Sequence, residues 1–146
     1  MPATRRAEAI WSGDLLSGKG TVSAGTGLFR DLPVSWSSRT ESAQGRTSPE
    51  ELLAAAHAAC FSMAFSNGLA KNGTPATRLA VSSDVTFDKV GDGWKVTKSK
   101  LRVRGTVPGI DEAKFIELAQ AAKDGCPISG ALKGNVALSV DAKLES

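Results

Sequence analysis

The chain has 146 residues, of which 41% are hydrophobic and 23% are charged, a balance typical of a globular protein with a packed core. This length fits one domain, and we expect a single domain over residues 1–146. The net charge is only +3 and the basic residues are scattered, so we expect no nucleic-acid partner.

The N-terminus and the apolar runs predict where the protein resides. Residues 1–13, MPATRRAEAIWSG, contain two arginines with no apolar run behind them, which is not the pattern of a secretory signal. No run approaches the roughly 20 apolar residues that span a bilayer. We therefore expect a cytoplasmic protein with no membrane partner, in a compartment that keeps thiols reduced.

The first forty residues predict three strands separated by turns. The strands are expected within AEAIWSG at 7–13, KGTVSAGTGLF at 19–29 and DLPVSWSSR at 31–39. Residues 40–48, TESAQGRTS, predict a mobile polar loop.

The strongest helix signal follows this loop. Ser48 is a candidate N-cap, Pro49 suits the first helical position, and Glu51 stands three residues after the cap. Gly73 and Pro75 end the helix. Because this stretch carries almost no charge, we expect a central, buried helix. Its apolar residues recur at helical spacing: Leu52, Leu53, Ala56, Cys60, Met63 and Ala64.

The second half of the chain predicts a hairpin, two helices and a strand. The hairpin strands span 77–90 and 94–107, and a change of phase predicts a β-bulge near Ser99. A helix is expected from about Asp111 to Gly125, with glycine as a left-handed cap. Pro127 begins a short helical piece, and residues 135–144 form the last strand. The order βββ-α-ββ-α-α-β is that of an α+β fold.

Neither a cofactor nor a metal site is predicted. GDLLSGKG at 13–20 nearly matches a phosphate-binding loop, but Gly20 stands where serine or threonine would hold magnesium. No helix follows it. Two distant cysteines and one histidine provide no close pair of metal ligands.

The two cysteines are the main candidates for chemistry. Cys60 lies in the long helix and Cys126 lies between Gly125 and Pro127, where backbone amides can favour a thiolate. In a reducing compartment, a transient catalytic disulfide is a more natural interpretation than a permanent one. His57, three residues before Cys60, is either the base of a Cys–His acyl-transfer pair or a histidine that faces a polar gap.

Two segments at this separation resemble the OsmC/Ohr family of bacterial thiol peroxidases, which reduce organic hydroperoxides. They are RTSPEELLAAAHAACFSMA at 46–64 and GCPISGAL at 125–132. The similarity extends over essentially the whole chain and is greater to the osmotically inducible protein C branch. It includes WSGDLLSGKGTVS, SSRTES, DVTFDKVGDGWKVTK and VPGID. The resemblance implies an intertwined α+β homodimer, with long central helices packed between antiparallel sheets.

The resemblance also implies the roles of four residues. Cys60 matches the cysteine that attacks the peroxide, and Cys126 matches the resolving cysteine. The family's glutamate falls on Glu50 and its arginine on Arg39. Because the arginine of the other branch comes from near the N-terminus, two further arginines remain alternatives: Arg46 and Arg30.

Helix geometry bears on how such a site is assembled. Ten helical residues rise about 15 Å, so Glu50 cannot reach Cys60 along its own helix. Either Glu50 acts through the loop arginine or it comes from a partner's antiparallel helix, and the second option favours a two-fold homodimer. An external dithiol would reopen the disulfide, and the resemblance suggests a dihydrolipoyl group.

Two other functions remain open at this point. A redox-inert protein of the same fold could bind a small apolar ligand, and its thiols would survive stoichiometric peroxide. A Cys–His acyl hydrolase would depend on His57 and not on Cys126. A two-cysteine peroxidase predicts the reverse.

Overall fold

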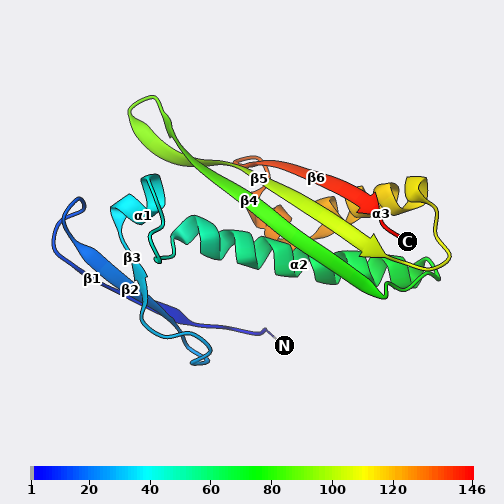
Figure 1. Ribbon diagram of the computed structural model, residues 1–146, viewed down its shortest axis with the longest axis horizontal. Helices are drawn as coiled ribbons and strands as arrows, with labels where there is room; N and C mark the ends of the chain where they lie inside the picture. Colours follow the sequence, from blue (N-terminus) through cyan, green and yellow to red (C-terminus); the bar gives the residue numbers. More distant parts are fainter. Residues whose placement is uncertain (1) are drawn as a thin grey trace. The chain divides into compact units, whose positions relative to one another are not determined.

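The computed structural model describes residues 2–146, with strands and helices in the order βββ-αα-ββ-αα-β (Figure 1). The α+β fold class is confirmed. The backbone forms two compact units, which divide between Leu52 and Leu53. Each unit contains one three-stranded sheet. The expectation of a single domain over 1–146 stays a prediction.

The first unit is built on the antiparallel sheet β1-β2-β3. Its strands are β1 (Ala7–Ser12), β2 (Lys19–Ala24) and β3 (Leu32–Val34). Gly20 of β2 lies directly under the ring of Trp11, because a β-carbon at this glycine would stand 2.7 Å from the ring. The indole therefore packs against this glycine of the neighbouring strand.

The third predicted strand is only partly correct. It ends at Val34, and residues Trp36–Thr40 form a short helix, α1, that the sequence analysis missed. Ser35 and Ser38 make a capping box: the Ser38 amide donates to Ser35 Oγ at 3.1 Å, and the Ser35 amide donates to Ser38 Oγ at 3.0 Å. This reciprocal cap turns the strand into a helix and carries Arg39 on its last turn.

Helix α2 (Pro49–Lys71) begins and ends as predicted. The amide of Glu51 donates to Ser48 Oγ at 3.1 Å, which confirms the N-cap. Beyond the last turn Gly73 adopts a positive φ of 82°, and its amide donates to the Ala70 carbonyl at 3.0 Å.

The prediction that α2 is buried all round is wrong for the single chain. Apart from Glu50 in the first turn, the buried positions are spaced four apart and form one face: His57, Phe61, Phe65 and Leu69. The face expected to be core is half-buried or exposed, and Met63 is 72% exposed. Methionine, alanine and serine gave no phase signal that distinguished the two faces.

Helix α2 also corrects the expectation about membrane spans. By length and composition alone, residues Pro49–Lys71 could cross a bilayer, and 22% of that apolar stretch is buried in the structure. The core helix of a soluble protein passes the same test.

The second unit is built on the sheet β4-β5-β6. Strands β4 (Arg78–Val90) and β5 (Gly93–Thr106) form the predicted hairpin, and β6 (Ala137–Leu144) pairs with β5 in parallel. This sheet is therefore mixed, and the expectation of antiparallel sheets is wrong for it, because α3 and α4 form a crossover between β5 and β6. Thr86 pairs with Lys98 and Phe87 with Val96. The expected bulge is therefore confirmed, with the extra residue two positions before Ser99.

Helices α3 (Glu112–Gly125) and α4 (Pro127–Leu132) meet at Cys126. The expectation of a left-handed cap at Gly125 is wrong, because this glycine is the last helical residue and has no positive φ. The chain instead turns at Cys126, which is extended with φ −65° and ψ 127°. Proline disfavours a helical conformation in the residue before it, which explains why the turn falls on the cysteine.

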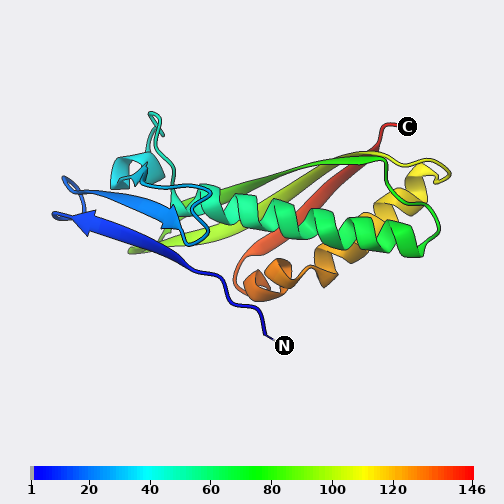
Figure 2. The ribbon, with the colours of Figure 1, turned by 90° about the horizontal axis from the view of Figure 1, so that it is seen from below.

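The core of the second unit lies between the sheet and the helices α2 and α3 (Figures 1 and 2). The rings of Phe65 and Phe115 join the two helices with centroids 5.0 Å apart. The Phe115 ring also fills the space over Gly105, where a β-carbon would stand 2.7 Å from it. This packing fixes α2 beside the turn that carries Cys126. The buried residues include Phe61, Phe65, Leu69, Leu101, Val103 and Phe115.

Candidate active site: a thiol pair and an arginine–glutamate pair

The second unit brings the two cysteines together. Cys60 projects from α2 and is half-buried, whereas Cys126 at the α3–α4 turn is only 1% exposed. Both are reduced thiols. The Cys60 thiol donates a hydrogen bond to the sulfur of Cys126. The two thiols are therefore neighbours, as the formation of a disulfide between them requires.

The surroundings shift the pKa values of the two thiols in opposite directions. Burial raises the pKa of Cys60, and the hydrogen bond to Cys126 raises it further. Burial also acts to raise the pKa of Cys126, but hydrogen bonds from the Cys60 thiol and from the amide and hydroxyl of Ser129 outweigh it and lower that pKa. A nearby cation would oppose the effect of burial on Cys60 and favour its thiolate.

His57 is buried beside this pair and bonded to two serines. Its Nδ1 lies 2.6 Å from Ser99 Oγ and its Nε2 lies 2.8 Å from Ser129 Oγ. Burial lowers the pKa of His57, so the ring is neutral at pH 7. Since both nitrogens bond to serines, the geometry favours the polar-gap interpretation over a base aimed at Cys60.

The buried histidine predicts a pH-dependent stability. Below about pH 6.5 the imidazole of an unfolded chain takes up a proton that the buried ring resists, so the free energy of unfolding should fall as the pH drops below this value. The slope for one proton is at most about 1.4 kcal/mol per pH unit. Urea unfolding between pH 7.5 and 5 measures it. His57→Gln should flatten the slope, because this is the only histidine of the chain; an unchanged slope would contradict the assignment.

The first unit contains a second pair of candidate residues. Arg39, on α1, grips the carboxylate of Glu50, in the first turn of α2, with a bidentate hydrogen bond. Nε lies 3.0 Å from Oε1 and Nη2 lies 3.0 Å from Oε2. Glu50 is 7% exposed, and the guanidinium carbon stands 6.0 Å from the ring centroid of Trp36. The guanidinium is thus held in one orientation.

Arg39 also borders an apolar pocket of the first unit, about 370 Å³ in volume. Two tryptophans provide its flat walls. An alkyl or aryl group of a small molecule could fill this space beside the cation. The other lining residues are Trp11, Leu15, Val34, Ser35, Trp36 and Pro49.

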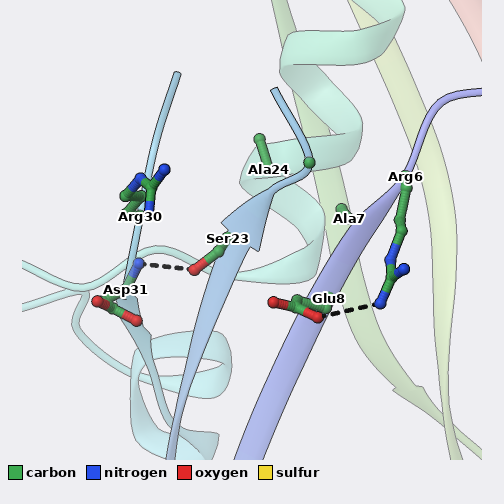
Figure 3. A pocket seen from close by; sticks show the side chains of 8 residues that line it. Arg6, Ala7, Glu8, Ser23, Ala24, Arg30 and Asp31 are labelled. Atoms are coloured by element: carbon green, nitrogen blue, oxygen red, sulfur yellow. Dashed lines mark hydrogen bonds and ion pairs between the residues drawn. The ribbon is translucent and has the colours of Figure 1, made fainter. Parts of the chain in front are cut away.

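The two alternative arginines lie elsewhere in the first unit. Arg30 lines a polar hollow of about 420 Å³, in which Arg6 pairs with Glu8 at 3.3 Å and the Asp31 amide donates to Ser23 Oγ (Figure 3). Arg46 is exposed on the loop before α2. Arg39, rather than either of these, pairs with Glu50. In the described part of the chain, residues 2–146, no group of His, Cys, Asp and Glu side chains is arranged to hold a metal ion.

Comparison with known proteins identifies the family. The family model described as OsmC-like protein matches residues 41–141. This range includes three of the four candidate residues, Glu50, Cys60 and Cys126, and begins two residues after Arg39. The chain belongs to the OsmC-like family. The family resemblance noted in the sequence is confirmed.

Relatives of this OsmC-like chain cover its full length. It is 43% identical to peroxiredoxin OsmC of Escherichia coli, over 98% of this chain and 99% of that protein. The crystal structure of the organic hydroperoxide resistance protein OhrB of Bacillus subtilis covers 94% of this chain and 98% of its own, with 26% identity and a TM-score of 0.74. An OsmC-like protein from Vibrio cholerae has a TM-score of 0.75 at 17% identity and supports the fold alone. Membership of this family indicates a soluble protein.

The serines around His57 were not predicted from the sequence. Ser99, Ser129 and Ser83 come from β5, α4 and β4, and no spacing pattern connects them. The only signal available was Ser99 itself, a polar residue next to a change of phase in an otherwise apolar strand.

Proposed function

We propose that the chain is a cysteine-based peroxidase that reduces organic hydroperoxides to alcohols, with Cys60 as the attacking and Cys126 as the resolving cysteine. The contact between the two thiols supports this most directly, because resolution requires them to meet. The names of the relatives agree: one is a peroxiredoxin and others are organic hydroperoxide resistance proteins.

The reaction passes through two sulfur oxidation states. The Cys60 thiolate attacks one oxygen of the hydroperoxide, the O–O bond breaks, and the alkoxide takes up a proton to leave as an alcohol. Cys60 is then a sulfenic acid. Cys126 attacks its sulfur, the S–O bond breaks, and water and a disulfide are formed. An external dithiol, for which we propose a dihydrolipoyl group, reduces the disulfide by exchange.

The Arg39–Glu50 pair supplies the missing cation. A guanidinium near Cys60 opposes the effect of burial and favours the thiolate, and it stabilises the negative charge that develops on the leaving alkoxide. Glu50 keeps the planar fork in place through two hydrogen bonds. The apolar pocket beside Arg39 favours hydroperoxides with an organic group over hydrogen peroxide.

We propose a homodimer in which the Arg39–Glu50 pair of one subunit acts on the thiols of the other. The ten-residue separation of Glu50 and Cys60 along one helix supports this, since it corresponds to about 15 Å. So does the exposed apolar face of α2, with Met63 72% exposed, which a second copy of the helix would cover. We also propose that each subunit is a single domain and that the protein resides in the cytoplasm.

A thiol count tests the function. One equivalent of tert-butyl hydroperoxide should remove both free thiols and leave a monomeric chain about two mass units lighter, the signature of one intramolecular disulfide. Intact mass before and after the addition measures it. If both thiols survive, the chemistry is absent and the apolar pocket becomes the site of a redox-inert binding protein.

A further inference from the structure

A line of hydrogen bonds leads from the resolving cysteine to the edge of the second unit. Ser129 lies in the first turn of α4, three residues after the N-cap Cys126, and its hydroxyl lies 2.8 Å from His57 Nε2. This hydroxyl also helps to lower the pKa of Cys126. His57 Nδ1 lies 2.6 Å from Ser99 Oγ, which lies 2.9 Å from Ser83 Oγ. Side chains from four elements, α4, α2, β5 and β4, thus form one unbroken series.

This series joins a buried end to a wetter one. Ser129, His57 and Ser99 are at most 1% exposed, whereas Ser83 is half-buried. Placing three such polar side chains in a core is costly unless each is bonded, and among residues 2–146 no buried side-chain nitrogen or oxygen lacks a partner.

We propose that Ser129, His57, Ser99 and Ser83 form a proton relay that serves Cys126. The inference rests on the proposed peroxidase function. In each catalytic cycle Cys126 loses a proton when the disulfide forms and regains one when the disulfide is reduced. Because this thiol is 1% exposed, it has little direct access to water.

The transfer balances without a lasting charge on the ring. In the thiol form Cys126 donates to Ser129, Ser129 donates to Nε2, and Nδ1–H donates to Ser99. When Cys126 attacks the sulfenic sulfur of Cys60, its proton moves to Ser129, Nε2 gains a proton as Nδ1 releases one to Ser99, and Ser83 passes one to water. The S–S bond forms, the S–O bond breaks, and the hydroxide that leaves takes a proton from water. Cys126 is oxidised and the sulfenic sulfur is reduced.

The groups around Cys126 suit this role. From α2 it faces Cys60 directly and neutral His57 through Ser129. On α3 the neighbouring Lys123 and Asp124 pair with each other at 3.5 Å. A histidine whose burial lowers its pKa avoids becoming an imidazolium, which fits a ring that exchanges tautomers as it passes a proton.

The variant His57→Gln tests whether His57 relays a proton or has only a structural role. Glutamine keeps a donor and an acceptor, so it can bond both serines, but it cannot exchange tautomers. Quenched-flow measurement with tert-butyl hydroperoxide follows two steps, dimedone trapping of the sulfenic acid and loss of the second thiol. We expect an unchanged first step and a disulfide step slowed by roughly 10²-fold. The defect should shrink as the pH rises and the thiol ionises without help.

Other variants keep the test decisive. Ser129→Ala should give the same selective defect and Ser129→Thr should restore the rate. Ser83→Ala, at the half-buried end, removes one hydroxyl with little risk to folding, and its neighbour Ser82→Ala, which is exposed, is the matched control. An equal loss in both steps, or a defect that is independent of pH, would show a structural role and overturn the relay. No change in either step would also overturn it. Survival of both thiols in the wild-type protein after addition of the hydroperoxide would instead refute the proposed function.

Discussion

Replacing Cys60 by serine is expected to abolish hydroperoxide reduction, whereas replacing Cys126 by serine should allow a single turnover and then stop. Loss of a covalent nucleophile costs on the order of 10⁴-fold or more in rate. Without Cys126 the attacking thiolate still forms, but its sulfenic acid has no internal partner. It should then react with added dimedone, or oxidise further when peroxide is in excess.

The same pair of variants tests which thiol attacks. Cys126 has the lowered pKa within its own unit, whereas burial raises the pKa of Cys60. If Cys126 were the attacker, Cys60→Ser would keep the first-turnover burst and carry dimedone on Cys126. Mass spectrometry of the labelled peptides distinguishes the two assignments. Steady turnover by Cys126→Ser with a dithiol would contradict its resolving role.

Much of the fold could be predicted because local signals agreed with it. Ser48 and Pro49 marked the start of α2, Gly73 its end, and the phase change near Ser99 marked a bulge that the structure confirms within two residues. These features depend on hydrogen bonds and backbone conformations within a few residues of sequence. Helix α1 was missed because residues 31–39, DLPVSWSSR, were interpreted as one strand, which concealed the capping box of Ser35 and Ser38.

For the candidate site too, some features could be predicted from the sequence and others could not. The contact of Cys60 with Cys126 and the pairing of Arg39 with Glu50 agree with what the family resemblance suggested, while their catalytic roles remain proposals. The relay around His57 could not be predicted, because its members come from elements that only tertiary packing brings together. The buried face of α2 was misjudged because alanine-rich helices have apolar residues on every side.

Arg39→Met is expected to slow peroxide attack by roughly 10²- to 10³-fold, the usual cost of removing one donor from developing negative charge. Arg39→Lys keeps the charge but loses the bidentate hydrogen-bonding geometry of the guanidinium. It should therefore be faster than Arg39→Met but slower than the wild type. Glu50→Gln keeps the shape of the side chain but weakens the hydrogen bonds to Arg39. The loss of rate should therefore be smaller than that of Arg39→Met. Stopped-flow rates of sulfenic acid formation measure all three, and Arg46→Met is the matched control because Arg46 is exposed. A larger loss for Arg46→Met would reassign the cation.

Mixing an inactive variant with a strongly slowed one decides whether the site is shared between subunits. A dimer of one Cys60→Ser chain and one Arg39→Met chain contains an intact thiol pair in one subunit and an intact arginine–glutamate pair in the other. If the arginine–glutamate pair acts across the interface, this heterodimer has one complete site, and the rate should rise well above that of either variant when the two proteins are refolded together. If Arg39 serves the thiol of its own chain, neither subunit is complete and activity does not return. Sedimentation of the same mixture establishes that heterodimers form. Rescue requires both a dimer and an arginine that acts across the interface, so it would identify the cation that opposes the effect of burial on the pKa of Cys60.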